Sequence, residues 1–286
     1  MDYLNREQYG DRPLFYGQTF ASPLDYQNSK FGEDGKPIYI QRNGKYEIVE
    51  HRPEYKYQGN MLFPRMYSSD ERHIEQYKLW SGFTGRPMNV KDREGRIQSI
   101  MQPTMMENLR FFFSYQVNFM YWRYFLWNFS GRQNDIQSHG ELIHGNWVTG
   151  IPFIDEMLVG NQELLPDSLR NNKGHNVYFM LPLLLGLVGL FYQVSKKRGT
   201  EGVRGFVIVF LLFFLTGLAI VMYLNQTPLQ PRERDYAYAG SFYAFGIWIG
   251  LGVLAIVDKM IQFKVPAKVA SIASTIICML CVPTLM

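Results

Sequence analysis

Residues 206–224 read FVIVFLLFFLTGLAIVMYL, a run without a single charged side chain. A helix of about 20 apolar residues has the length needed to cross the roughly 30 Å hydrocarbon core of a bilayer. Three further uncharged runs of similar length follow or precede it, at 177–194, 236–257 and 269–286. Long buried helices of a soluble protein would carry polar faces, which these runs lack. The sequence therefore predicts a mainly α membrane protein with four transmembrane helices.

The charged residues divide the chain into two unlike parts. Residues 1–176 hold 20 Lys/Arg and 21 Asp/Glu, whereas 177–286 hold 9 and 4, so the net charge of +4 arises in the second part. A basic balance of this origin gives no indication of nucleic-acid binding. The loops 195–205 and 258–268 are both net positive, and Lys and Arg collect in cytoplasmic loops. We therefore expect the first part of the chain and the loop 225–235 on the extracytoplasmic side.

The first part is predicted to form an irregular α+β lobe. Residues 1–106 are rich in Pro and Gly turn signals, with one well-marked β-hairpin near 38–49, centred on an Asn-Gly pair that favours a type I′ turn. Residues 130–176 are a polar connector that leads to the first apolar run.

An aromatic helix is predicted at 107–129. Eleven residues between positions 111 and 129 are Phe, Tyr or Trp. A spanning helix here would carry Arg123 near its centre, at a cost of roughly 2.5–3.5 kcal/mol on the lenient insertion scale. A helix lying in the membrane interface avoids that cost and suits aromatic side chains. The sequence favours the interfacial helix and leaves the spanning one open.

The loop 228–238, PLQPRERDYAY, is the most informative polar stretch. Its two prolines keep it out of a helix, and four charges follow at the edge of a predicted span. Arg232 and Arg234, with Tyr236, could bind the phosphate of a lipid, because a guanidinium offers a planar fork of donors and stays charged. An Arg–carboxylate clamp that orients two helices explains the same residues equally well.

Other polar side chains on the predicted extracytoplasmic side could line a substrate. The segment 5–13 contains Arg6, Glu7 and Asp11, whose carboxylates could act as a base or form structural salt bridges. Further substrate-lining candidates, which could equally be caps and anchors of the aromatic helix, are Glu107, Arg110, Arg123, Arg132 and Asp135.

Several kinds of chemistry are not indicated. The five histidines show neither an HxH nor an HExxH spacing, so we expect no metal and no cofactor. The chain has no P-loop and no GxGxxG motif, which argues against nucleotide hydrolysis. Cys278 and Cys281 lie inside the last apolar run and are interpreted as ordinary membrane-helix cysteines.

Five strings of residues carry a family resemblance: 3–14, 107–112, 121–124, 131–135 and 232–242. They are similar to the motifs of a large bacterial family of polytopic membrane proteins related to the animal transmembrane protein O-mannosyltransferase that acts on plexin-type domains. The resemblance covers nearly the whole chain. It implies a GT-C type glycosyltransferase of the bacterial inner membrane with an extracytoplasmic active site. The implied donor is a polyprenyl-phosphate sugar, with mannose as one candidate, and the implied acceptor is a Ser or Thr hydroxyl of an exported protein.

One departure from that family concerns the catalytic base. The family's carboxylates lie in an Asp…Glu motif of the first extracytoplasmic loop, followed by His-Pro-Pro, and this sequence contains neither. We therefore expect an internal part of a longer protein, inactive alone, in which Glu7, Asp11 and Asp235 are weaker local candidates for the base. A transporter or flippase of lipid-linked saccharides and a non-catalytic membrane scaffold are the alternative functions.

Overall fold

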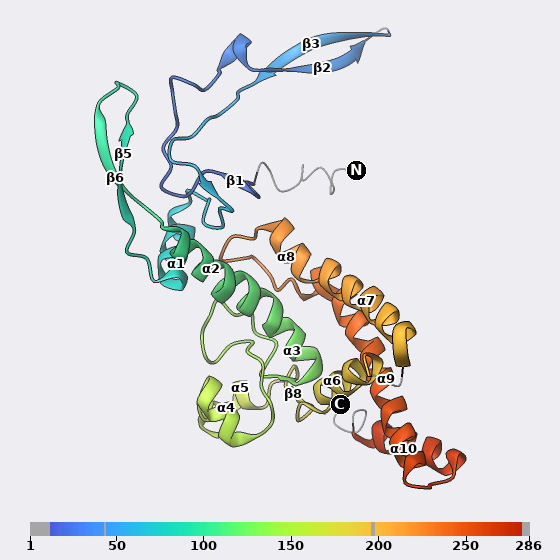
Figure 1. Ribbon diagram of the computed structural model, residues 1–286. Coiled ribbons are helices and arrows are strands. Elements are labelled where there is room, and N and C mark those ends of the chain that lie inside the picture. The colour runs from blue at the N-terminus through green and yellow to red at the C-terminus, as the bar shows by residue number, and fades with distance from the viewer. Residues whose placement is uncertain (1–11, 43, 196–197, 282–286) are drawn as a thin grey trace. The chain divides into compact units, whose positions relative to one another are not determined.

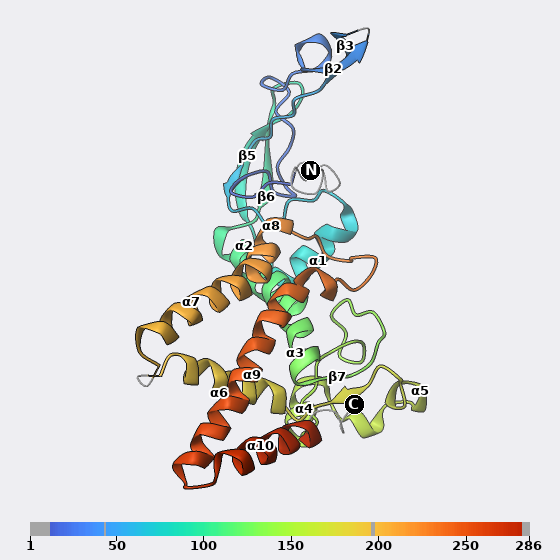
Figure 2. The same cartoon turned by 90° about the vertical axis from the view of Figure 1, so that its right-hand side faces the viewer.

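Helices make up about half of the described chain, which comprises residues 12–42, 44–195 and 198–281 of the computed structural model (Figure 1, Figure 2). The sheets within these residues are small antiparallel pairs of strands. The prediction of a helical chain with small β-elements is therefore confirmed. The contacts divide the chain into two compact units, Met1–Ser114 with Thr227–Leu229, and Tyr115–Gln226 with Gln230–Met286.

The first unit contains two β-hairpins. β2 (Lys36–Arg42) pairs with β3 (Lys45–Arg52), and the Arg42–Lys45 register leaves a two-residue connection in which Gly44 has a φ of +75°. Glycine adopts that conformation without a steric cost, so the hairpin lies where the Asn-Gly pair predicts it. The second hairpin, β5 (Arg86–Lys91) with β6 (Ile97–Gln102), has no counterpart in the sequence analysis.

The remaining elements of the first unit are short and well capped. α1 (Glu71–Ser81) begins where the Asp70 side chain accepts the Arg72 N–H, and it ends at Gly82 in the left-handed conformation. These are strong start and stop signals in a stretch that was predicted to be irregular. α2 (Met105–Phe111) starts with a capping box between Thr104 and Glu107. The other elements are β1 (Tyr16–Gly17), η2 (Gly32–Asp34) and β4 (Met61–Leu62).

The predicted aromatic helix is present and begins slightly earlier than expected. α2 continues directly into the π-helical stretch η3 (Phe112–Trp122) and then α3 (Arg123–Phe129). Most of its rings are buried against other protein groups, and Phe125 and Phe129 form a core with Phe245 and Trp248. Whether this helix lies in the membrane interface or spans the bilayer stays open.

In the second unit, helices occur in all four apolar runs: α6 (Leu181–Gln193), α7 and α8 (Gly199–Thr216, Leu218–Leu224), η6 with α9 (Asp235–Tyr238, Ala239–Gln262) and α10 (Ala267–Cys281). α6 packs closely on α9, because a Cβ on Gly189 would lie 1.8 Å from the Trp248 carbonyl oxygen. Only a residue without a side chain permits such an approach of two backbones.

Two of these helical stretches are long and apolar enough to cross a membrane: Gly199–Leu224 and Asp235–Gln262. Only 17% and 28% of their most apolar windows are buried within the structure. A core helix of a soluble protein would be mostly covered, so their exposure supports association with a membrane. α6 and α10 have 13 and 15 residues and are shorter than a span requires. The expected fourth run extends into 282–286, outside the described residues. Four spans therefore stay a prediction.

The connector of the second unit folds around a short strand pair. β7 (Gly131–Arg132) pairs with β8 (Asn176–Val177). Between these strands lie α4 (Pro152–Val159), η4 (Gln162–Leu164) and α5 (Asp167–Arg170). The connector therefore begins and ends at the same place, immediately after α3 and immediately before α6.

Candidate functional site

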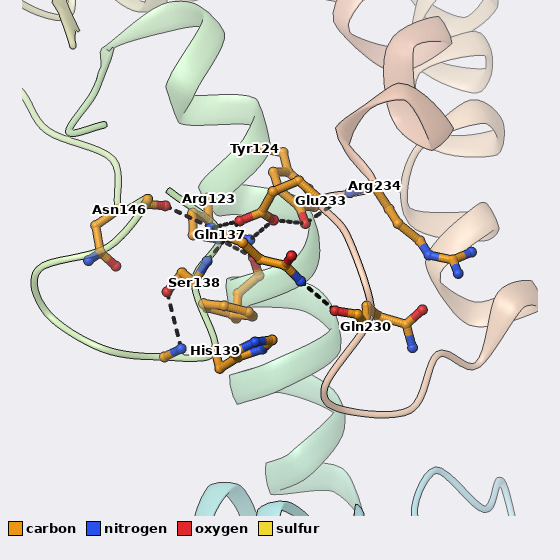
Figure 3. A network of polar contacts seen from close by, with 12 residues as sticks. Arg123, Tyr124, Gln137, Ser138, His139, Asn146, Gln230, Glu233 and Arg234 are labelled. Atoms are coloured by element: carbon orange, nitrogen blue, oxygen red, sulfur yellow. Dashed lines mark hydrogen bonds and ion pairs between the residues drawn. The ribbon is translucent and has the colours of Figure 1, made fainter. Parts of the chain in front are cut away.

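The carboxylate of Glu233 lies at the centre of a polar cluster (Figure 3). The cluster joins α3, the connector and the loop 228–238, which we call the arginine-rich loop. Arg123 donates from Nη2 to Oε2 of Glu233 at 2.7 Å and from Nη1 to Oε1 at 3.2 Å. The Tyr124 hydroxyl donates to Oε2 at 2.5 Å, and the Ser138 N–H donates to Oε1 at 3.0 Å. Both carboxylate oxygens are therefore satisfied by groups of the same unit. We call these four residues the Glu233 cluster.

The Arg123 guanidinium is enclosed by protein, with only 3% of its side chain exposed. Besides Glu233, it donates from Nη1 to the Gly145 carbonyl at 2.7 Å and from Nε to the Phe119 carbonyl at 3.0 Å. Its Cζ lies 4.0–4.7 Å from the ring centroids of Phe119, Tyr124 and Trp127. A buried cation needs such partners, because an unpaired charge away from water is very costly.

The pKa of Glu233 is lowered from its ordinary value. Burial by itself raises this pKa, but the hydrogen bonds and the positive charge of Arg123 outweigh it, with help from Tyr124 and Ser138. Hydrogen bonds to the charged form and a nearby opposite charge both favour ionisation. Glu233 is therefore a carboxylate at neutral pH, and as such it is a poor proton donor.

The arginine-rich loop is attached to the rest of the unit at three successive points. The Gln230 carbonyl accepts from the Gln137 amide, Glu233 binds Arg123, and the Arg234 N–H donates to the Tyr124 hydroxyl at 3.2 Å. This explains how a stretch that prolines keep out of a helix nevertheless takes one defined path. The clamp that the sequence offers as one interpretation of this loop is present, with Arg123 as the partner of Glu233.

The two arginines beside Glu233 do not share its ion pair. Among the residues that the structure describes, neither Arg232 nor Arg234 forms a salt bridge. Arg232 is exposed and lies 5.8 Å from the ring centroid of Tyr236. The Arg234 side chain points away from the Glu233 carboxylate (Figure 3), and its buried Nε has no hydrogen-bond acceptor in the part of the chain that the structure describes. Asp235, half-buried, opens the short helix η6.

Two buried amide side chains of the connector, Asn134 and Gln133, hold the loop that contacts the cluster. Asn134 accepts the Gly145 N–H through Oδ1 at 2.8 Å, and Gly145 in turn accepts from Arg123. Gln133 binds Asn146 through Oε1 and donates from Nε2 to Leu142 and to Gln162. Buried amides with all these contacts hold the loop rigidly in one conformation.

The remaining predicted site residues lie elsewhere or have other partners. Glu107 belongs to the first unit and accepts hydrogen bonds from Thr84, Gly85 and Thr104, at 2.6–2.9 Å. Burial raises the pKa of Glu107, but the bonds from the Thr104, Gly85 and Thr84 backbone outweigh this and bring the pKa to about 2. Arg110 donates to the Ser81 carbonyl in the same unit. Glu107 thus caps the start of α2, whereas Arg110 binds the last residue of α1.

In the second unit, Arg132 donates to the Asn134 carbonyl and stacks 4.0 Å from the Trp127 ring centroid, whereas the Asp135 side chain is exposed. Arg6, Glu7 and Asp11 lie outside the described residues. Of all the predicted site residues, Arg123 and Arg234 come together at the Glu233 cluster through their bonds to Tyr124 and Glu233.

Tyr124, Glu233, Gln133 and Asn134 lie in the strings 121–124, 232–242 and 131–135 that carry the resemblance, but none of them was among the predicted site residues. Glu233 had a usable signal, because a carboxylate between two arginines at a membrane edge needs a partner of its own. No local pattern identifies Arg123 as that partner. Within the described residues no group of three or more His, Cys, Asp or Glu side chains is placed to hold a metal ion.

Comparisons with known proteins add one finding. Residues 10–113 match the model of a family described as "Family of unknown function (DUF8416)". This match covers the larger part of the first unit and assigns no activity to it. Neither the curated proteins nor the solved structures give a match to the chain.

Proposed function

We propose that this chain is part of a membrane glycosyltransferase of the GT-C type, related to the bacterial family that its motifs resemble. It transfers a sugar such as mannose from a polyprenyl-phosphate donor to Ser or Thr hydroxyls of exported proteins. In this proposal the bilayer, the lipid-linked sugar and the exported acceptor are the partners.

The observation that supports this proposal is that the Glu233 carboxylate of the arginine-rich loop is paired, whereas its two arginines form no ion pair among the described residues. Glu233 is occupied by Arg123, Tyr124 and Ser138, so it does not neutralise its two neighbours. Arg232 and Arg234 therefore add two positive charges at the N-terminal end of Asp235–Gln262, a helix long and apolar enough to cross a membrane. A helix N-terminus attracts anions and a guanidinium binds phosphate with several donors. A phosphate attached to a membrane lipid fits this combination of charge and depth.

The chemistry requires two groups. The sugar's anomeric carbon exchanges its bond to the donor phosphate for a bond to the acceptor oxygen, and the polyprenyl phosphate leaves with the bonding electrons. Arg232 and Arg234 would stabilise the charge that develops on that phosphate. A carboxylate would take the proton of the acceptor hydroxyl. Asp235 is the candidate within the described residues, and Glu7 and Asp11 are the others in this sequence.

In the proposed architecture the four apolar runs span a bacterial inner membrane. Residues 1–176 and the loop 225–235 then lie on the extracytoplasmic side, and the loops 195–205 and 258–268 lie on the cytoplasmic side. In this proposal the ion pair between Glu233 and Arg123 preorganises the site, because it fixes the loop that carries both arginines before the donor binds. A site that is preorganised in this way spends no binding energy on ordering the loop.

The test uses Arg232→Ala and Arg234→Ala, introduced at the chromosomal locus so that the natural protein is assayed. We expect glycosylation of exported proteins to fall at least ten-fold in each variant while membrane insertion is unchanged. Arg204→Ala is the matched control, because Arg204 is exposed and belongs to the other predicted side of the membrane.

A second measurement separates the enzyme from a carrier of lipid-linked saccharides. Binding of a polyprenyl phosphate to the purified chain in nanodiscs is measured for the same variants. Loss of both lipid binding and glycosylation supports the transferase. Unchanged lipid binding in both variants would exclude the phosphate-binding role of the loop, and lost lipid binding with normal glycosylation would favour the carrier.

A further inference from the structure

A cavity of about 390 Å³ lies in the connector of the second unit, between α4, η4 and the end of β8. This volume is within the range of sites that hold a small molecule or a single protein side chain. It is not part of the Glu233 cluster, and none of the predicted site residues lines it.

Part of the cavity lining is apolar. Val148, Val177 and Phe179 contribute to it, and Phe179 is 43% exposed. Phe179 has a φ of +51°, an uncommon and costly conformation for a residue with a large side chain. A Cβ on Gly150, which has a φ of +80°, would lie 1.9 Å from Cγ1 of Val177 and 3.0 Å from the Phe179 ring. Glycine at position 150 therefore lets the ring lie where it faces the cavity.

The polar part of the lining contains carboxylates beside the amides of Asn161 and Gln162. Glu156 and Glu163 are exposed, and neither forms an ion pair among the described residues. His175 Nδ1 lies 3.0 Å from the Gln133 carbonyl oxygen. Because a carbonyl only accepts, Nδ1 carries a proton in this contact. Among the described residues, the lining contains neither Lys nor Arg.

Asp155 also lines the cavity but is already occupied. Its Oδ1 accepts from the Thr149 N–H at 2.6 Å and from the Thr149 hydroxyl at 2.8 Å, and its Oδ2 accepts from the Gly150 N–H at 2.8 Å. Asp155 therefore holds the turn in front of α4, and its charge adds to the negative potential of the cavity. Glu156 and Glu163 remain for a ligand.

This combination defines the chemistry of the occupant. Carboxylates favour positive charge, and the three apolar side chains favour an apolar stem beside the charged group. A phosphate would be repelled. A lysine or arginine side chain meets both conditions, because its methylene groups cover apolar surface while its charged end reaches a carboxylate.

The cavity is connected to the Glu233 cluster through one residue. Gln133 accepts from His175 with its carbonyl, donates to Gln162 at the cavity, and accepts from Asn146 on the other side. The neighbouring Gly145 carbonyl binds Arg123. A group bound in the cavity would thus lie at a fixed position relative to the arginine-rich loop.

We propose that this cavity is a docking subsite for a lysine or arginine side chain of a polypeptide, and that it positions the acceptor segment of an exported protein. The preference for a basic side chain stands on the cavity alone, and only the identification of the polypeptide as the acceptor rests on the proposed function.

The experiment measures binding of a synthetic peptide with blocked ends and one lysine to the purified full chain in nanodiscs. The matched peptide has glutamine in place of lysine. We expect the lysine peptide to bind about ten-fold more tightly, and the preference to disappear in Glu156→Gln/Glu163→Gln and to weaken as salt is raised. Asp167→Asn removes an exposed carboxylate of the same connector and is the control that should bind normally.

Two further measurements make the result specific. A carbodiimide joins a lysine amine only to a carboxylate that it touches, so the cross-link should map to Glu156 or Glu163 by mass spectrometry. Phe179→Gly removes the ring while tolerating a φ of +51°, and it should weaken both peptides several-fold without unfolding the chain. Equal affinity for the two peptides, or cross-links that map elsewhere, would overturn the proposal.

The assay contains no donor lipid, so it does not depend on sugar transfer. Normal peptide binding by Arg232→Ala together with unchanged glycosylation would reject the proposed transferase but leave the basic-side-chain site intact. Equal binding of both peptides by the parent chain, together with loss of glycosylation in Arg232→Ala, would reject the basic-side-chain site but leave the proposed transferase intact. Failure of the site and failure of the proposed function are therefore distinguishable.

Discussion

Oε2 of Glu233 lies 2.7 Å from Nη2 of Arg123, although the two residues are 110 positions apart in the chain. Their side chains are 17% and 3% exposed, and a second bond between Nη1 and Oε1 makes the pair bidentate. Bidentate pairs of this kind are specific in geometry as well as strong. The pair fastens the loop before α9 to the helix that precedes the connector.

The first prediction concerns Glu233→Gln. This change leaves the Arg123 guanidinium buried without its counter-charge, which typically costs about 3–5 kcal/mol. We expect a clear fall in the midpoint of thermal unfolding of the purified chain. Asp167→Asn, which removes an exposed carboxylate, should leave the midpoint unchanged. A double-mutant cycle with Arg123→Gln should yield a coupling energy above about 1 kcal/mol, and simple additivity would contradict a specific pair.

The second prediction concerns Tyr124→Phe. The hydroxyl donates to Glu233 and accepts the Arg234 N–H, so its removal leaves two partners of a largely buried network unmatched. We expect a loss of about 1–3 kcal/mol in unfolding free energy. If the loop binds a lipid phosphate, polyprenyl-phosphate affinity should also fall. Tyr243→Phe is the control, because Tyr243 is 76% exposed, and an equal effect of both changes would contradict a specific role of Tyr124.

The third prediction concerns the contact between α6 and α9. Gly189→Ala would place a methyl group 1.8 Å from the Trp248 carbonyl oxygen and 2.6 Å from the Gly252 nitrogen. Both obstacles are backbone atoms, so the helices must separate, at a cost of about 1–3 kcal/mol or more. Gly246→Ala on α9 meets no atom within 4 Å and should be neutral or slightly stabilising. Thermal unfolding of the two variants in the same detergent measures the difference.

The fourth prediction concerns pH and Glu107. The pKa of this carboxyl is about 2 in the folded chain and 4.5 in its ordinary state, so the folded state holds the charged form more strongly. Its contribution to stability is fully present above pH 4.5 and is lost as the pH falls from about 4.5 to 2. In Glu107→Gln, unfolding midpoints should be lower at pH 6 and change less over that interval. Glu75→Gln, at an exposed position, should keep the steep dependence of the parent chain.

The fifth prediction concerns topology. In a chain with Cys278→Ser and Cys281→Ser, single cysteines are introduced by Pro231→Cys and Thr200→Cys, both at exposed positions. We expect a membrane-impermeant maleimide to label position 231 in intact spheroplasts and position 200 only after permeabilisation. Labelling of both positions from the same side would contradict a membrane crossing by Gly199–Leu224.

The helical part of the fold could be predicted from sequence because its cause is local. An apolar run in a chain has to satisfy its backbone hydrogen bonds internally, and only a helix does so within one segment. The Asn43-Gly44 hairpin was predictable for a similar reason, since a two-residue turn determines its own register. α1 carried equally local signals in Asp70 and Gly82, and weighing those caps would have identified it.

The sequence of the arginine-rich loop by itself determined that two arginines and two carboxylates lie at the edge of an apolar helix. It also determined that some of these charges need partners. Only the tertiary structure decided that Glu233 is paired with Arg123 and that Arg232 and Arg234 form no ion pair with another described residue. The physical reason is that ion pairs within a helix or turn are restricted to neighbouring positions, whereas this pair forms across 110 residues through the packing of α3 and the connector. The sequence could determine the charges of this site, but which of them pair with each other depended on which buried cation the fold brought to the carboxylate.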